Sequence, residues 1–277
     1  MKRSIELSGK SLSTLTNYAR CLATMTLHFK CSPLDLDSEQ VLDYLHYLQS
    51  KKKTPSSSYF KHTLYGLRFV YKLYGKAPLL HSLPSLKKVH KLPVVLSVPE
   101  IKSLIAAPKL LKHRLLIAMM YGCGLRRSEL MNIRLSHVDL DRQMLHISQG
   151  KGRKDRYVPL GENLSYAIGK YLDAVKPYIW LFNGNGSDGT PGQFSANGVR
   201  WIISEARKKA GIQKQISSHI LRHTYATHLL EMGSDIMTLK DLLGHMDIKT
   251  TMLYLHICNL DKPKAFSPMD RIYRLKK

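Results

Sequence analysis

Apolar residues recur with a helical period through most of the first 75 positions. In the segment 11–29, Leu15, Tyr18, Leu22 and Met25 are spaced by three or four residues, which places them on one face of a helix. The segments 38–52 and 56–75 show the same period, and the second of these ends at a glycine. The pattern predicts an N-terminal domain built from helices.

The period breaks at residues 83–100, LPSLKKVHKLPVVLSVPE, where three prolines and four basic residues predict an extended linker. Helical spacing resumes at 98–107 and 111–125, and returns at 162–175, 195–211, 217–233 and 234–244. Between these helices, QMLHIS (143–148) and RYVPL (156–160) alternate as strands of a hairpin around QGKGRKD, IWLF (179–182) suggests a third strand, and 182–193 is expected to be loop.

The predicted fold class is therefore mainly α. It comprises a helical N-terminal domain at 1–86, a basic linker at 87–98, and a larger, mostly helical domain at 99–277 with a small β-hairpin or sheet. The sequence contains no internal repeat of fixed period.

Charge narrows the class of partner. The chain has 43 Lys and Arg against 20 Asp and Glu, a net charge of +23 and a pI near 9.9. Such an excess favours a polyanion. No apolar run approaches the roughly 20 residues of a spanning helix, and the N-terminus lacks the apolar stretch of a signal peptide. Nucleic acid is the expected partner, and the four dispersed cysteines fit a reducing compartment.

Several side chains are candidates for chemistry, although each has a plainer explanation alone. His219 and Arg222 are three residues apart on a predicted helix, so both can project from one face. His223, four residues after His219, suggests a metal pair, but no third ligand has suitable spacing and no metal is predicted. Tyr254 follows His245 by nine residues in an apolar stretch, where an aromatic ring normally serves packing.

In combination these segments are specific. GLRRSEL (124–130), GKGRKDRYVPL (150–160), HILRHTYATHLL (219–230) and LLGHMDIKTTMLY (242–254), in this order, resemble the tyrosine recombinase (phage integrase-like, Xer-type) family over essentially the whole chain. The resemblance implies a core-binding domain followed by a catalytic domain with a C-terminal tail. It also implies this catalytic set: Arg126, Lys151, His219, Arg222, His245 and Tyr254. Arg127 and Leu255 depart from the residue types usual at their positions.

The chemistry of a DNA phosphodiester explains why such residues are suitable. Two arginines hold phosphoryl oxygens with permanent charge and several donors, so neither a metal nor another cofactor is expected. A phenol with a pKa near 10 needs positioning and a proton acceptor, for which His219 is the candidate. His245 is expected to hydrogen-bond the phosphate, and Lys151 to protonate the leaving 5′-oxygen. The family implies a 3′-phosphotyrosyl intermediate on Tyr254.

The resemblance further implies that the partners are double-stranded recombination sites, bound by a homotetramer on two duplexes that forms from monomers or dimers. No membrane partner is expected, and the implied location is the bacterial cytoplasm, associated with the nucleoid. Basic residues of the N-terminal domain, linker and hairpin are predicted DNA contacts: Lys52, Lys61, Arg68, Lys88, Lys91, Arg153 and Lys154.

Several alternatives stay open at this stage. An integron-type integrase and a type IB topoisomerase-like nicking–closing enzyme are the alternative enzymes, and a catalytically silent DNA-binding module is the alternative outside catalysis. Within recombination, the sequence leaves chromosome dimer resolution, mobile-element integration and an integron-type reaction undecided.

Overall fold

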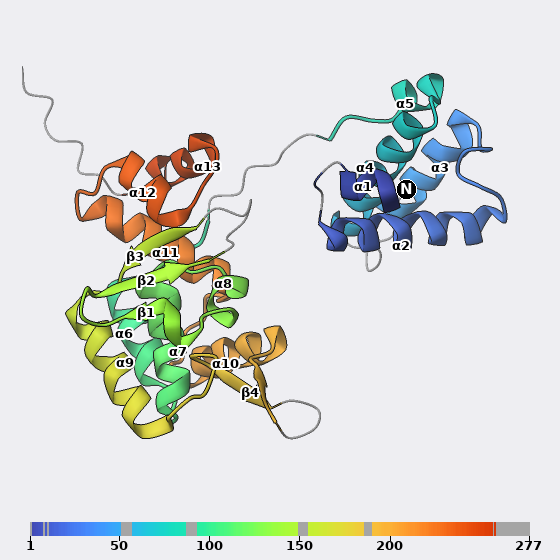
Figure 1. Ribbon diagram of the computed structural model, residues 1–277. Helices are drawn as coiled ribbons and strands as arrows, with labels where there is room; N and C mark the ends of the chain where they lie inside the picture. Colours follow the sequence, from blue (N-terminus) through green and yellow to red (C-terminus); the bar gives the residue numbers. More distant parts are fainter. Residues whose placement is uncertain are drawn as a thin grey trace, which may run out of the picture. The chain divides into compact units, whose positions relative to one another are not determined.

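The computed structural model describes residues 2–7, 9, 11–50, 57–86, 93–148, 155–185, 190–256 and 258. The chain forms two compact units, Met1–His90 (unit 1) and Lys91–Lys277 (unit 2), shown in Figure 1. The mainly α fold class predicted from the sequence is confirmed.

In the described part of unit 1, all regular secondary structure is helical. Its helices are α1 (Lys2–Leu7), α2 (Leu12–Phe29), α3 (Ser38–Ser50), α4 (Ser57–Leu73) and α5 (Ala77–Ser82). Ser11 caps α2 by accepting a hydrogen bond from the backbone N–H of Thr14. Asp37 caps α3 by accepting from the backbone of Gln40, whose side chain accepts in return from the Asp37 N–H.

The core of unit 1 consists of the apolar faces that the spacing predicts. Leu22 and Met25 of α2 pack with Leu64 and Leu67 of α4, and Tyr71 hydrogen-bonds the carbonyl of a proline before α3. Because these faces are buried, the charged residues of α2 and α4 lie on the outside of the unit.

In unit 2, helices and two small sheets enclose a separate hydrophobic core. The elements of unit 2 are α6 (Val98–Ala106), α7 (Leu111–Gly122), α8 (Arg127–Met131), η1 (Leu135–His137), β1 (Val138–Asp139), β2 (Met144–Ile147), β3 (Arg156–Pro159), α9 (Glu162–Val175), β4 (Asn183–Asn185), β5 (Pro191–Gln193), α10 (Ala196–Lys209), α11 (Ser218–Glu231), α12 (Ile236–Leu243), α13 (Ile248–Met252) and η2 (Leu253–His256).

The predicted hairpin is present, and its pairing is antiparallel. β2 pairs with β3 so that Leu145 faces Val158, and β1 pairs with the other edge of β2, giving the order β1-β2-β3. Both Leu145 and Val158 are buried, so this face of the sheet joins the core. The side chains of Lys151, Arg153 and Lys154 lie outside the described residues.

Two expectations for unit 2 were wrong. The segment 179–182 adds no strand to this sheet: it hydrogen-bonds the chain at 133–135, where Trp180 forms only an isolated bridge with Arg134, because η1 begins at once. Its apolar residues Leu181 and Phe182 are buried in the core instead. The segment expected to be loop contributes β4 and β5, an antiparallel pair.

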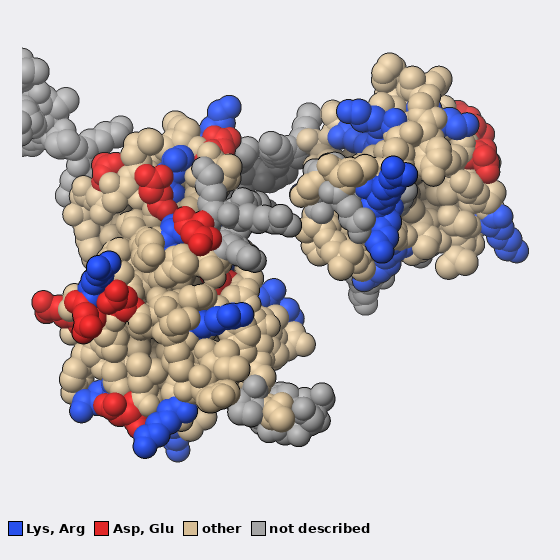
Figure 2. Space-filling model, in the orientation of Figure 1, with Lys and Arg blue, Asp and Glu red and all other residues tan. Residues whose placement is uncertain are grey.

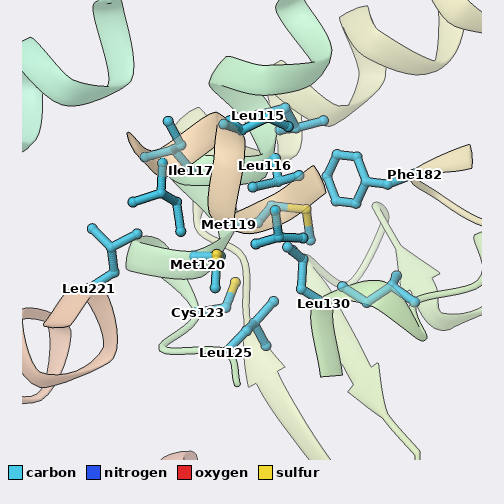
Figure 3. Close-up of a cluster of buried hydrophobic side chains, with 14 of the residues drawn as sticks. Leu115, Leu116, Ile117, Met119, Met120, Cys123, Leu125, Leu130, Phe182 and Leu221 are labelled. Atoms are coloured by element: carbon cyan, nitrogen blue, oxygen red, sulfur yellow. The ribbon is translucent and has the colours of Figure 1, made fainter. Parts of the chain in front are cut away.

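The core of unit 2 centres on α7, which has buried side chains on most of its surface. Figure 3 shows Leu115, Leu116, Met119 and Met120 of this helix packed with Phe182 and with residues from neighbouring elements. A helix apolar on most sides must be covered on most sides, and α6, α9 and α11 pack against it. The helices α8 and α11, which position the candidate site, pack against this centre.

None of the helices in the described part of the chain combines the length and the apolar composition needed to cross a membrane.

Candidate functional site

Arg126 lies at the junction between α7 and α8, where the chain makes a tight turn. Gly124 has a φ of +57°, and a Cβ at this glycine would lie 2.3 Å from the Tyr225 ring, so both the conformation and the space require glycine. The backbone N–H and the guanidinium of Arg126 both donate to Glu129 one turn later. The Arg126 side chain also donates to the carbonyl of Gly244, at 3.3 Å.

Arg222 projects from α11 and is buried, with 4% of its surface exposed. Its guanidinium donates to the carbonyls of Gly124 and Leu243 and contacts His245 Nε2 at 3.1 Å. Burial, followed by the nearby charge of Arg126, lowers the pKa of Arg222 to about 10, so it stays protonated at neutral pH. The group is therefore a fixed positive charge shielded from water.

Glu129 is the anion that holds these cations together. Its carboxylate accepts two hydrogen bonds from Arg156 on β3, at 3.0 and 2.8 Å, and lies 3.8 Å from Arg222. Although burial opposes ionisation, the hydrogen bonds and charges of Arg156 and Arg126 bring the pKa of Glu129 down to about 2. We refer to Arg126, Glu129, Arg156 and Arg222 as the arginine centre.

The arginine centre also joins distant elements. Arg156 donates through Nε to the carbonyl of Leu242 at the end of α12, at 2.8 Å. The centre thus ties α8, β3, α11 and the end of α12 together. Its net charge is +2, because one carboxylate faces three guanidinium groups, and that excess suits a phosphate oxygen.

His245 follows Gly244, which ends α12 in the left-handed conformation with a φ of 61°. Its Nδ1 lies 2.9 Å from the Thr251 hydroxyl and its Nε2 faces Arg222. These two contacts fix the plane of the imidazole at the edge of the arginine centre.

Tyr254 lies on η2, directly after α13, and is 2% exposed. It packs in a separate apolar group, the tyrosine cluster, which consists of Tyr225, Ala226, Leu230, Leu239, Leu243 and Tyr254. Its hydroxyl lies 3.0 Å from His223 Nδ1. Burial raises the pKa of Tyr254, while the charges of Arg222 and Arg126 oppose that rise.

His219 lies one turn before His223 on α11 and lines a cavity of about 310 Å³ together with Arg126, Arg127 and Arg200. Burial and then the charge of Arg222 lower the pKa of His219, which favours the neutral ring. The cavity opens beside the arginine centre, so a phosphate there meets both Arg126 and His219.

Of the six predicted catalytic residues, Arg126, His219, Arg222, His245 and Tyr254 are described and belong to this one region. The sixth, Lys151, lies outside the described residues, as do the predicted DNA contacts Lys52, Lys88, Lys91, Arg153 and Lys154. Lys61 is exposed on α4, and Arg68, on the same helix, donates to the carbonyl of Pro84.

Sequence reasoning missed Glu129 and Arg156 of this region, and it considered His223 only as a metal ligand and not as a partner of Tyr254. Glu129 had a detectable signal, since a carboxylate three residues after Arg126 suits the first turn of a helix. Arg156 and His223 contact partners 27 and 31 positions away, Glu129 and Tyr254 respectively, and no local pattern reveals such pairs.

Comparison with known proteins agrees with this geometry. Residues 95–259 match the phage integrase family, and residues 1–79 match the phage integrase N-terminal SAM-like domain. The chain therefore belongs to the phage integrase family and is a tyrosine recombinase, as the motifs predicted.

Individual relatives extend the match. Tyrosine recombinase XerA of Pyrococcus horikoshii is 30% identical over 257 residues, which cover 91% of this chain and 86% of the relative. A crystal structure of XerA recombinase is 29% identical with a TM-score of 0.57, covering 99% and 96% of the two chains. XerH recombinase bound to a palindromic difH substrate in a post-cleavage complex shares the fold, at a TM-score of 0.72 and 19% identity, covering 91% and 78%.

Proposed function

We propose that this protein cuts and rejoins DNA at specific sites through a 3′-phosphotyrosyl intermediate on Tyr254. The observation that carries the proposal is the placement of buried Arg222: its guanidinium contacts His245, and its charge acts on the Tyr254 hydroxyl. One charged group thus contacts His245, the proposed phosphate ligand, and acts electrostatically on Tyr254, the proposed nucleophile.

In the proposed reaction, Arg126 and Arg222 bind the non-bridging oxygens of the scissile phosphate and stabilise the added charge of the transition state. His245 forms a hydrogen bond with the same phosphate. The Tyr254 oxygen bonds to phosphorus as the bond to the 5′-oxygen breaks, and Lys151 gives that oxygen its proton. Attack by a 5′-hydroxyl reverses these steps and reseals the strand without an external energy source.

The proposed partner is double-stranded DNA, bound by both units. In Figure 2, lysine and arginine side chains gather on the visible face of unit 1, whereas basic and acidic groups are interspersed on unit 2. Lys61 is proposed as a phosphate contact in unit 1. XerH in its post-cleavage complex is bound to a DNA substrate, and here a homotetramer on two duplexes is proposed, formed from monomers or dimers, in the bacterial cytoplasm at the nucleoid.

A nicked suicide substrate tests the proposal, because its cleaved end diffuses away and the covalent complex accumulates. Wild-type protein should form a covalent adduct in excess EDTA, with DNA attached to the peptide that contains Thr251 and Tyr254. Tyr254→Phe should fold and bind the same DNA but form no adduct. Attachment to Tyr225, or cleavage only with Mg²⁺, would overturn the proposal.

Two assays on the same protein distinguish recombination from the alternative, a type IB topoisomerase-like activity. Relaxation of a supercoiled plasmid without a target site would favour nicking and closing, whereas exchange between two cognate sites requires recombination. Target sites selected from random DNA would then separate an integron-type reaction from integration or dimer resolution.

A further inference from the structure

The Tyr254 hydroxyl has a histidine partner that is not the one the motifs suggest. Nδ1 of His223 lies 3.0 Å from the phenol oxygen, and the two rings lie 5.5 Å apart with an interplanar angle of 53°. His219, one turn earlier on α11, instead lines the cavity beside Arg126. The two histidines therefore face different partners.

The surroundings of His223 keep its ring neutral. Its pKa is lowered by burial, followed by the charges of His219 and Arg222 on its own helix. From outside α11, Tyr254 on η2 contacts the ring directly, and the charges of Arg222 and Arg126 act on that phenol. A neutral imidazole with its proton on Nε2 presents a lone pair at Nδ1, and the phenol donates to that lone pair.

The phenol also needs this acceptor. Tyr254 is 2% exposed, and burial raises its pKa, so free phenolate is scarce at neutral pH. A base within hydrogen-bonding distance can take the proton as the bond to phosphorus forms, so that no phenolate has to exist beforehand.

We propose that His223 is the catalytic proton acceptor for Tyr254, which leaves His219 to bind the phosphate. This inference rests on the proposed nucleophilic role of Tyr254. During cleavage the Tyr254 oxygen–phosphorus bond forms, the bond from phosphorus to the 5′-oxygen breaks, and the phenol proton moves to His223 Nδ1. During rejoining the 5′-hydroxyl attacks phosphorus and gives its proton to Lys151, the bond from phosphorus to the Tyr254 oxygen breaks, and His223 returns the proton to that oxygen.

The test measures single-turnover cleavage of a suicide substrate whose 5′-bridging oxygen is replaced by sulfur. Because a thiolate leaves without a proton, the remaining pH dependence reports deprotonation of the phenol. Wild-type cleavage should be nearly independent of pH between about pH 7 and 9, since His223 is already neutral there. His223→Phe should be slower by about 100-fold or more at pH 7, and its rate should rise about tenfold per pH unit.

Two further variants separate proton transfer from positioning. His223→Gln keeps an acceptor for the phenol hydrogen but is not a base, so its rate should rise with pH as that of His223→Phe does. His228→Gln is the matched control: His228 on the same helix pairs with the Tyr121 hydroxyl at 2.8 Å, outside the site. Its pH profile should keep the wild-type shape. If His223→Phe does not fold, His223→Gln alone decides the question.

A His223→Phe rate within threefold of wild type with a flat pH profile would overturn the inference. So would a His223→Gln protein with wild-type rate and profile, because the histidine would then only position the phenol. Both results leave an adduct on Tyr254 and hence the proposed function intact. A wild-type adduct on another tyrosine would remove both proposals.

Discussion

The two halves of the site are built in opposite ways. In the arginine centre, the charged groups are fixed by hydrogen bonds to a carboxylate and to backbone carbonyls of α12 and of the α7–α8 turn. Tyr254 lies on a short 3₁₀ segment, is packed by apolar neighbours, and has a single hydrogen bond described for its hydroxyl.

The difference indicates that the fold preorganises the arginine centre, whereas it holds Tyr254 less firmly. Charges that stabilise a transition state are most effective when they need not reorganise, which requires a rigid frame around them. A nucleophile must approach phosphorus and later withdraw, so a short 3₁₀ segment held mainly by apolar contacts suits it better. Substitutions in the arginine centre should therefore affect both stability and chemistry, and substitutions around Tyr254 chiefly chemistry.

The largest effect is expected from Arg222→Ala. Loss of this guanidinium removes charge from the transition state and leaves the buried carbonyls of Gly124 and Leu243 without their donor. We expect the rate of covalent adduct formation to fall by about 10²- to 10³-fold and the free energy of unfolding to fall as well. Arg142→Ala, at an exposed arginine paired with Asp139, is the control and should change neither quantity. A rate within tenfold of wild type would contradict preorganised charge.

Next in size is Glu129→Gln, which keeps the shape of the side chain and removes its charge. The pKa of Glu129 falls from 4.5 to about 2 on folding, which corresponds to roughly 3 kcal/mol of stability. Since the folded pKa is the lower one, this stability is present above about pH 4.5 and is lost as the pH falls toward 2.

Chemical denaturation of both proteins between pH 2 and 7 measures this difference. The gap between wild type and Glu129→Gln should be largest at pH 7 and shrink steadily below pH 4.5. Glu100→Gln provides the comparison, because Glu100 pairs with Lys214 at the surface, where an ion pair contributes less than about 1 kcal/mol. A gap that does not change with pH would mean that Glu129 stabilises the fold through packing alone.

How far the sequence predicted these two halves depends on the range of the contacts. The helices α2, α3 and α4 of unit 1 and the β2–β3 hairpin follow from local periodicity, and their apolar faces are buried as expected, whereas the short helices α1 and α5 were not predicted. The four motifs, taken with the family resemblance, pointed to Arg126, Arg222, His245 and Tyr254. Arg156 was not predicted, because its hydrogen bonds to Glu129 form only when the chain folds and β3 comes close to α8.

Local sequence patterns also could not predict which histidine forms a hydrogen bond with the Tyr254 hydroxyl. Helical spacing puts His219 and His223 on one face of α11, and spacing alone cannot say which of them meets Tyr254. That is decided by where η2 packs, which depends on the apolar contacts of the tyrosine cluster. The misassigned strand at 179–182 has a similar origin, because a short apolar run fits either a strand or a buried connection.

A smaller effect is expected from Thr251→Val, which tests how firmly His245 is held. The Thr251 hydroxyl is buried and lies 2.9 Å from His245 Nδ1. Valine keeps the volume but not the hydroxyl, so adduct formation should slow by about five- to tenfold, as expected for one neutral hydrogen bond. Thr251→Ser, which retains the hydroxyl, should cleave at nearly the wild-type rate. Equal rates for the valine and serine variants would show that this contact does not orient the imidazole.

The smallest effect is expected from Lys61→Ala, which is compared with Arg68→Ala on the same helix, α4. The pair tests whether unit 1 also contains both charges fixed by the fold and charges available to DNA. Arg68 donates to the carbonyl of Pro84 at 2.7 Å and is thereby committed to the fold, whereas Lys61 is exposed. Lys61→Ala should leave the free energy of unfolding unchanged and reduce the slope of log affinity against log salt by about 0.9, the value for one phosphate contact. Arg68→Ala should instead lower the free energy of unfolding by about 1–3 kcal/mol. Binding titrations at several salt concentrations, with denaturation curves of the same samples, measure both quantities; an unchanged salt slope for Lys61→Ala would place the DNA on another face of unit 1.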